Sequence, residues 1–176
     1  LAFGAYQARR LLAGEIPLWN PYNYAGHPFL ADTQAAVFYP PRVLTIFLSQ
    51  LTGGWSYTAL QAEALAHYWL GALAMFLFVK TLTHSRIAGL VSSITLAFDG
   101  YLTGYPPLQL AILEAGIWLP LSLLGVYRAS ALPAEAKEQG RWRVRWLAVS
   151  ALALGMSLLA GHPQTSLFYL YVLITY

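Results

Sequence analysis

The chain has 176 residues, of which 58% are hydrophobic and 10% are charged, with no cysteine and a formal net charge of +3. Soluble domains usually carry about a quarter of charged residues, so this composition predicts an integral membrane protein. It excludes disulfides and thiolate metal sites. Because the basic residues are spread over several segments, it does not indicate nucleic acid as a partner.

Residues 1–57 differ in composition from a membrane-spanning helix. Prolines and Gly26 interrupt this segment and prevent one long helix; the prolines are Pro17, Pro21, Pro28, Pro40 and Pro41. Short helices are expected near 7–13 and 42–50. Aromatic residues are frequent, as in loops that lie on lipid headgroups. Aromatic faces also stack on sugar rings, so both interpretations are open for Trp19.

Apolar stretches follow near residues 58–80, 86–105, 108–127, 144–160 and 164–176. Roughly 20 apolar residues in a helix cover about 30 Å of hydrocarbon. We therefore expect an all-α, polytopic transmembrane helix bundle, joined to a long aromatic and proline-rich loop that contains short interfacial helices. Because the chain starts at Leu1 and ends within an apolar stretch, we also expect it to be a piece of a longer protein.

The basic residues predict how the chain is oriented in the cell membrane. They are concentrated in the turn between the first two apolar stretches and in the connection 128–143, and the positive-inside rule places both in the cytoplasm. Residues 1–57 are then an extracytoplasmic loop. Arg9, Arg10 and Arg42 lie in this loop and count against the assignment, although long translocated loops constrain topology weakly.

The acidic residues Glu63, Asp99 and Glu114 fall in the halves of the apolar stretches that this orientation places outside. Ionisable groups in a bilayer usually face a bundle interior or a watery cavity, and they often mark a functional site. Glu63 shares one helix face with His67 through their i, i+4 spacing. These side chains either line a polar pocket that opens outward or form hydrogen bonds between helices and snorkel to the headgroups.

Three short motifs resemble a known family. They are GEIPLWNPYNYAGHPFLADTQAAVFYPP at 14–41, AFDGYL at 97–102 and LAGHPQ at 159–164. With the intervening leucine-rich stretches, they resemble the YfhO-like bacterial membrane proteins of the C-type glycosyltransferase (GT-C) superfamily. The resemblance covers essentially the whole chain. It implies an enzyme that transfers a sugar from a polyprenyl-phosphate donor to a cell-envelope acceptor on the extracytoplasmic face, with 1–57 following a first spanning helix and lying at the active site.

Such a transfer breaks the bond between the anomeric carbon and the phosphate, and it needs a carboxylate to activate the acceptor hydroxyl. Asp32 lies in the motif region of the loop, so we expect it to act as the general base, with His27 orienting it or binding phosphate. Asp32 alternatively caps a short helix that starts near Thr33. GT-C enzymes usually carry an acidic residue just after their first spanning helix. That helix would precede Leu1, so a second alternative is that the principal catalytic acid lies upstream of Leu1.

The turn at 161–164 is the second expected contact with substrate. A tight turn needs the glycine and proline of this motif but neither His162 nor Gln164, so we expect these two residues to bind the phosphate or sugar of the donor. Asp99 is followed by glycine, which is a turn signature, and both a turn and a ligand role are open for it. The further expected substrate contacts are Trp19, Asn20, Gln34 and Asp99.

No metal ligand and no certain cofactor are predicted. His27, His67 and His162 could approach a divalent cation together with Asp32, but their spacing matches no known metal signature.

Two other classes of function stay open. A transporter or translocator of lipid-linked sugar would use intramembrane acids for proton or ion coupling, and a structural envelope protein would need no chemistry. The enzyme is preferred because the acids cluster toward one membrane face and because a long loop precedes the bundle.

Overall fold

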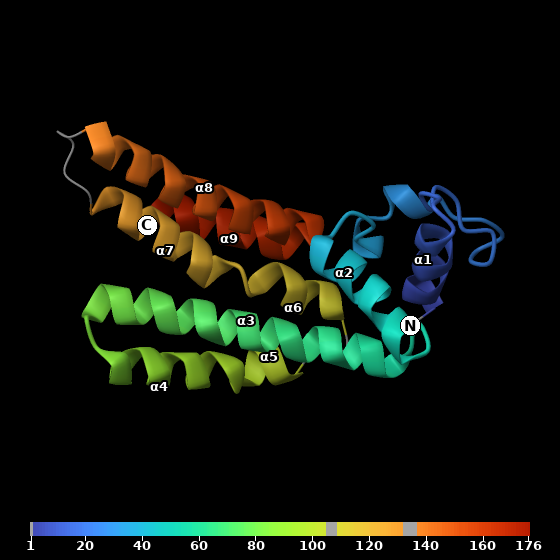
Figure 1. Cartoon of the computed structure of the whole chain (residues 1–176), viewed down its shortest axis with the longest axis horizontal. Helices are drawn as coiled ribbons and strands as arrows, with labels where there is room; N and C mark the ends of the chain where they lie inside the picture. The colour runs from blue at the N-terminus through green and yellow to red at the C-terminus, as the bar shows by residue number, and fades with distance from the viewer. Residues whose placement is uncertain (1, 105–108, 132–136) are drawn as a thin grey trace.

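The computed structural model describes residues 2–104, 109–131 and 137–176 (Figure 1). Within these ranges the regular structure is helical, apart from one isolated β-bridge between Asn20 and His27. The helices after residue 56 run side by side along the long axis of the molecule. Residues 2–56, which we call the N-terminal segment, gather at one end of this bundle. We call that end the loop end and the opposite one the far end.

The bundle contains four helical stretches that are long and apolar enough to cross a membrane. This finding confirms the expected all-α class and agrees with the expected membrane protein. α3 (Tyr57–Thr83) packs along α4 (Arg86–Ala97) and along α7 (Leu119–Ser130). α7 in turn packs along α8 (Lys137–Leu159). α9 (Pro163–Thr175) lies against α6 (Leu110–Gly116), α7 and α8. The four stretches are Tyr57–Thr83, Arg86–Gly104, Leu110–Ser130 and Gly140–Leu159.

Two of the stretches are interrupted where the sequence predicts continuous spans. The stretch expected at 108–127 consists of α6 (Leu110–Gly116) and α7, because Pro120 in the first turn of α7 lacks an N–H and its ring crowds the preceding turn. The stretch expected at 86–105 consists of α4 and the short α5 (Gly100–Gly104), which Asp99 separates. The expected ends at residues 105 and 108 lie outside the described residues.

The connection expected at 128–143 is largely helical. α7 continues to Ser130 and α8 already begins at Lys137. The sequence of 137–145 contains no proline and is rich in lysine, arginine, glutamate and glutamine, which are good helix formers. Residues 132–136 of the expected connection lie outside the described residues.

The N-terminal segment is built from short helices around a small core of its own. Its helices are α1 (Ala2–Leu12), η1 (Phe29–Ala31), η2 (Thr33–Ala35), α2 (Pro40–Ser49) and η3 (Gln50–Thr52). The core contains Tyr6, Phe29, Ala35 and Val37. α2 starts with two prolines, which favour the first helical turn because their fixed φ suits a helix and no N–H is needed there.

A glycine turn of the bundle lies against the N-terminal segment. Gly161 connects α8 to α9 with φ +83°, in the left-handed region that favours glycine. A Cβ at this position would overlap the backbone carbonyl of Thr33 in η2. Ala160 also packs with Ala36, Tyr39 and Ala115. The turn 161–164 and the segment 32–36 are therefore neighbours, although more than 120 residues of sequence separate them.

We predict that Gly161→Ala destabilises the protein by about 2 kcal/mol or more. Alanine is strained at a left-handed φ, and its Cβ would collide with the Thr33 carbonyl. Thermal unfolding in detergent measures the effect. Gly155→Ala, in an open position of α8, is the matched control and should leave the melting temperature unchanged or slightly higher. Equal melting temperatures for the two variants would contradict the close approach of this turn to η2.

Candidate functional site

A buried ion triad joins α2 to the bundle. Arg42 of α2 donates through Nε to both carboxylate oxygens of Glu63 in α3, at 2.7 and 2.9 Å. Its Nη2 donates to Oε1 of Glu114 in α6 at 2.9 Å. Arg42 is 9% exposed, while Glu63 and Glu114 are 3% and 0% exposed. One guanidinium from the N-terminal segment thus pairs with two carboxylates on two different membrane-spanning stretches.

A second set of hydrogen bonds lies beside the triad. His67 Nδ1 donates to the Glu63 carbonyl at 2.7 Å, so its Nε2 is left to accept from the Tyr39 hydroxyl, also at 2.7 Å. Trp118 Nε1 donates to the same hydroxyl oxygen at 3.1 Å. Tyr39 and His67 are fully buried. Tyr39 precedes α2 directly, so both ends of the first turn of α2 are fixed to the bundle.

Burial and the nearby carboxylates shift the pKa values of Arg42 and Tyr39. Burial alone would lower the pKa of Arg42, but the negative charges of Glu114 and Glu63 outweigh it and raise that pKa above its ordinary value. Burial, with the nearby charge of Glu114, also raises the pKa of Tyr39, so this hydroxyl stays protonated and can donate. The second oxygen of Glu114, Oε2, is buried and has no hydrogen-bond partner among the described residues.

The triad gives the acids Glu63 and Glu114 mainly a structural role, because each pairs with Arg42 of another helix. Of the two interpretations for Glu63, hydrogen bonding within the protein fits the geometry, because its carboxylate is enclosed and bound to Arg42. The role of Arg42 was not expected from the sequence, where this residue counted only as an exception to the charge rule. The sequence did contain a hint of this pairing. Two buried acids require a cation, and Arg42 directly follows a Tyr-Pro-Pro helix start.

A second pair of polar side chains lies near the surface of the N-terminal segment. His27 Nε2 and Asp32 Oδ2 are 3.0 Å apart, and the two side chains are 25% and 22% exposed. Asp32 Oδ1 accepts from the backbone N–H of Gln34 at 2.9 Å, which caps η2. The helix cap, which was the alternative role for Asp32, is thus confirmed. His27 is held by stacking on Phe3 and by the edge of Tyr24.

Trp19 and Asn20 have different environments. Asn20 is buried, exchanges two backbone hydrogen bonds with His27, at 2.8 and 2.9 Å, and accepts from the Tyr22 N–H through its side chain. It therefore holds the turn that presents His27 and is not exposed to a substrate. The Trp19 ring covers Gly26 and is 54% exposed, so it remains accessible to a ligand.

The other predicted contacts divide between the loop end and the bundle. His162 accepts from Thr165 N at 3.3 Å and pairs with its hydroxyl at 2.7 Å, which caps α9. Gln164 and Gln34 are both exposed, and their segments adjoin where Gly161 meets η2. His162, Gln164 and Gln34 therefore lie in segments that adjoin the His27–Asp32 pair.

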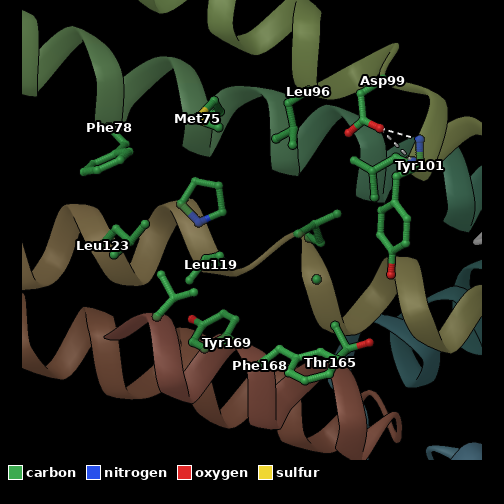
Figure 2. A pocket seen from close by; sticks show the side chains of 15 residues that line it. Met75, Phe78, Leu96, Asp99, Tyr101, Leu119, Leu123, Thr165, Phe168 and Tyr169 are labelled. Carbon is green, nitrogen blue, oxygen red and sulfur yellow. Dashed lines mark hydrogen bonds between the residues drawn. The ribbon is translucent and has the colours of Figure 1, made fainter. Parts of the chain in front are cut away.

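Asp99 lies in a different part of the molecule. It lines an apolar cavity of about 320 Å³ between the helices of the bundle. Figure 2 shows its side chain at one end of this cavity, hydrogen-bonded to the backbone N–H of Tyr101. It also accepts from the N–H of Leu102, so it starts α5 as a turn residue. The walls are mainly apolar and include Met75, Phe78, Leu96, Leu123, Phe168 and Val172.

The expected histidines do not assemble a metal site. Within the described part of the chain, no group of three histidine or acidic side chains is close enough to hold a metal ion. His67 is buried against Tyr39, and His162 is occupied with Thr165.

No protein-family model, curated protein or solved structure matches this chain. The resemblance to the YfhO-like family stays a prediction.

We predict that Arg42→Met lowers the free energy of unfolding by about 3–5 kcal/mol, because it leaves two buried carboxylates without a cation. Adding Glu63→Gln and Glu114→Gln to this variant should recover much of the loss, since no buried charge then lacks a partner. Thermal or denaturant unfolding in detergent compares the variants. A triple variant no more stable than Arg42→Met would contradict the triad.

Proposed function

We propose that the chain is part of a membrane-embedded glycosyltransferase that transfers a sugar from a polyprenyl-phosphate donor to a cell-envelope acceptor on the extracytoplasmic face. The observation that carries this proposal is the partly exposed His27–Asp32 pair, held at the loop end beside the turn 161–164. A histidine oriented by a carboxylate is a common general base, and an acceptor hydroxyl needs such a base.

In this proposal the roles of the two residues are the reverse of those expected from the sequence. Both oxygens of Asp32 already accept hydrogen bonds, from His27 and from the Gln34 N–H. The carboxylate therefore fixes the neutral imidazole with its proton on Nε2, and Nδ1 carries the free lone pair. His27 is the base and Asp32 is the residue that orients it.

The proposed reaction is a displacement at the anomeric carbon. The acceptor hydroxyl loses its proton to His27 Nδ1 while its oxygen bonds to the anomeric carbon. The bond from that carbon to the phosphate oxygen breaks, and polyprenyl phosphate leaves with the electron pair. Gln34 and Gln164, which are exposed in adjoining segments, supply hydrogen bonds for sugar hydroxyls.

The distribution of charge supports an extracytoplasmic loop end. The end of α3, the start of α4, the end of α7 and the start of α8 lie at the far end (Figure 1), and they carry a group of basic residues. By the positive-inside rule the far end then faces the cytoplasm. The basic residues are Lys80, Arg86, Arg128, Arg141, Arg143 and Arg145.

We predict that His27→Asn lowers sugar transfer by about 10²-fold or more, since a positioned general base contributes about that factor. The assay uses membranes that contain the full protein and follows radiolabelled hexose from a polyprenyl-phosphate donor into envelope material. His84→Asn replaces a histidine in the α3–α4 turn at the far end, and this matched control should keep full transfer. Equal transfer by both variants would remove His27 from the mechanism.

We further predict that Asp32→Asn separates the two roles of Asp32. Asparagine is as good a helix cap, so η2 and the melting temperature should be kept. Its amide cannot accept from His27 through nitrogen, so the imidazole loses its orientation and transfer should fall by about tenfold or more. Unchanged transfer together with unchanged stability would show that the pair is only structural.

A translocator of lipid-linked sugar is the second candidate, and the buried triad favours it. Two buried carboxylates face one guanidinium, and ionisable side chains inside a membrane bundle often serve ion coupling in transporters. Proteoliposomes distinguish the candidates. A translocator moves labelled glycolipid across the bilayer without forming a glycosylated product, whereas the proposed enzyme forms product from donor supplied on the side of the loop end.

A further inference from the structure

A cationic pocket lies in the N-terminal segment between α1 and the chain at 15–22. Its volume is about 440 Å³, and arginine and aromatic side chains dominate its lining. Neither arginine is among the substrate residues expected from the sequence. The lining consists of Tyr6, Arg9, Arg10, Ala13, Glu15, Trp19, Pro21 and Tyr22.

The two arginines differ in how far their charge is balanced. Arg10 Nη2 pairs with Glu15 at 2.8 Å, and both side chains are about half exposed. Arg9 lies over the Tyr22 ring, 5.6 Å from its centroid. Among the residues whose side chains are described, no carboxylate lies within ion-pair distance of Arg9. The pocket therefore carries two guanidiniums against one carboxylate, and a net positive charge remains for an anion.

The aromatic walls are exposed but held in place. Trp19 packs on Gly26, and its carbonyl accepts a hydrogen bond from the buried Tyr6 hydroxyl. Tyr22 packs edge-on against Tyr6 and donates its N–H to Asn20. Rigid, exposed aromatic faces lose little conformational entropy when a ligand covers them. Trp19 and Tyr22 are 54% and 72% exposed, which leaves their surfaces available.

We propose that this pocket binds a phosphate ester that carries a sugar or another polyol. A guanidinium presents a planar fork that matches phosphate oxygens, and Arg9 can supply it without breaking an ion pair. Trp19 stacks on the ring of the sugar, and Glu15 accepts hydrogen bonds from its hydroxyls. This inference rests on the proposed function and deepens it by assigning the recognition of a sugar phosphate to this pocket. The pocket lies near His27, whose backbone pairs with that of Asn20 next to Trp19.

The test is equilibrium binding of radiolabelled glucose 1-phosphate and of glucose to the full chain in phosphatidylcholine nanodiscs. We expect glucose 1-phosphate to bind at least about tenfold more tightly than glucose, because charge-assisted hydrogen bonds distinguish them. Arg9→Gln and Trp19→Leu should each weaken its binding about tenfold. Arg141→Gln, which changes an exposed arginine of α8 at the far end, is the control and should bind normally.

Phosphatidylglycerol nanodiscs distinguish the two sources of the phosphate. If glucose 1-phosphate binds equally well in them, the pocket takes soluble sugar phosphates. If binding falls in these nanodiscs and Arg9→Gln removes the difference, the pocket takes the phosphate of a lipid headgroup. Glucose 1-phosphate that binds no tighter than glucose, or an Arg9→Gln protein that melts normally and binds like the unchanged chain, overturns the proposal.

The binding assay contains no chemical step, so its outcome is separable from that of the transfer assay. His27→Asn should bind glucose 1-phosphate normally while losing transfer. Binding without any transfer in the unchanged protein would leave the pocket standing and remove the proposed function. Transfer that survives Arg9→Gln, together with unchanged binding, would remove only the pocket.

Discussion

Arg42 is the one charge on which the arrangement of the two parts of the molecule depends. It enters the bundle from α2 and pairs with Glu63 and Glu114, which come from two different membrane-spanning stretches. None of the three charges would be stable at this depth alone, because a buried ion without a partner costs several kcal/mol. The N-terminal segment docks in the position that brings the guanidinium between both carboxylates.

This docking sets the geometry of the surface above it. Tyr39 and Arg42 fix the first turn of α2, so the preceding segment 32–36 lies against the turn at Gly161. The capped helix η2 then presents Asp32, and the Asn20–His27 bridge presents His27. An exposed polar pair is thus held by buried contacts, which is the support that a reacting group needs if it is to keep its orientation.

The helical class and the approximate spans could be predicted from the sequence because apolar runs of about 20 residues have few other solutions. The turn at Asp99 was one of the two roles that its Asp-Gly pair left open, and it forms before Gly100. The helix break at Ile117–Trp118 was not predicted, since a run of apolar residues conceals the local effect of Pro120. At the site, Asp32 and His27 could be singled out by residue type. Their contact spans only five residues and could be expected from the sequence. The pairing of Arg42 with Glu114 joins segments 72 residues apart, which no single sequence displays.

The position of the N-terminal segment against the bundle can be measured directly by double electron–electron resonance. The chain contains no cysteine, so spin labels at Thr33→Cys and His84→Cys report one distance between η2 and the far end of the bundle. We expect a single narrow distribution, and a broad or shifted one when Arg42→Met is added. A distribution that is already broad with Arg42 present, or one that Arg42→Met leaves unchanged, would contradict the claim that the buried triad holds the two parts together.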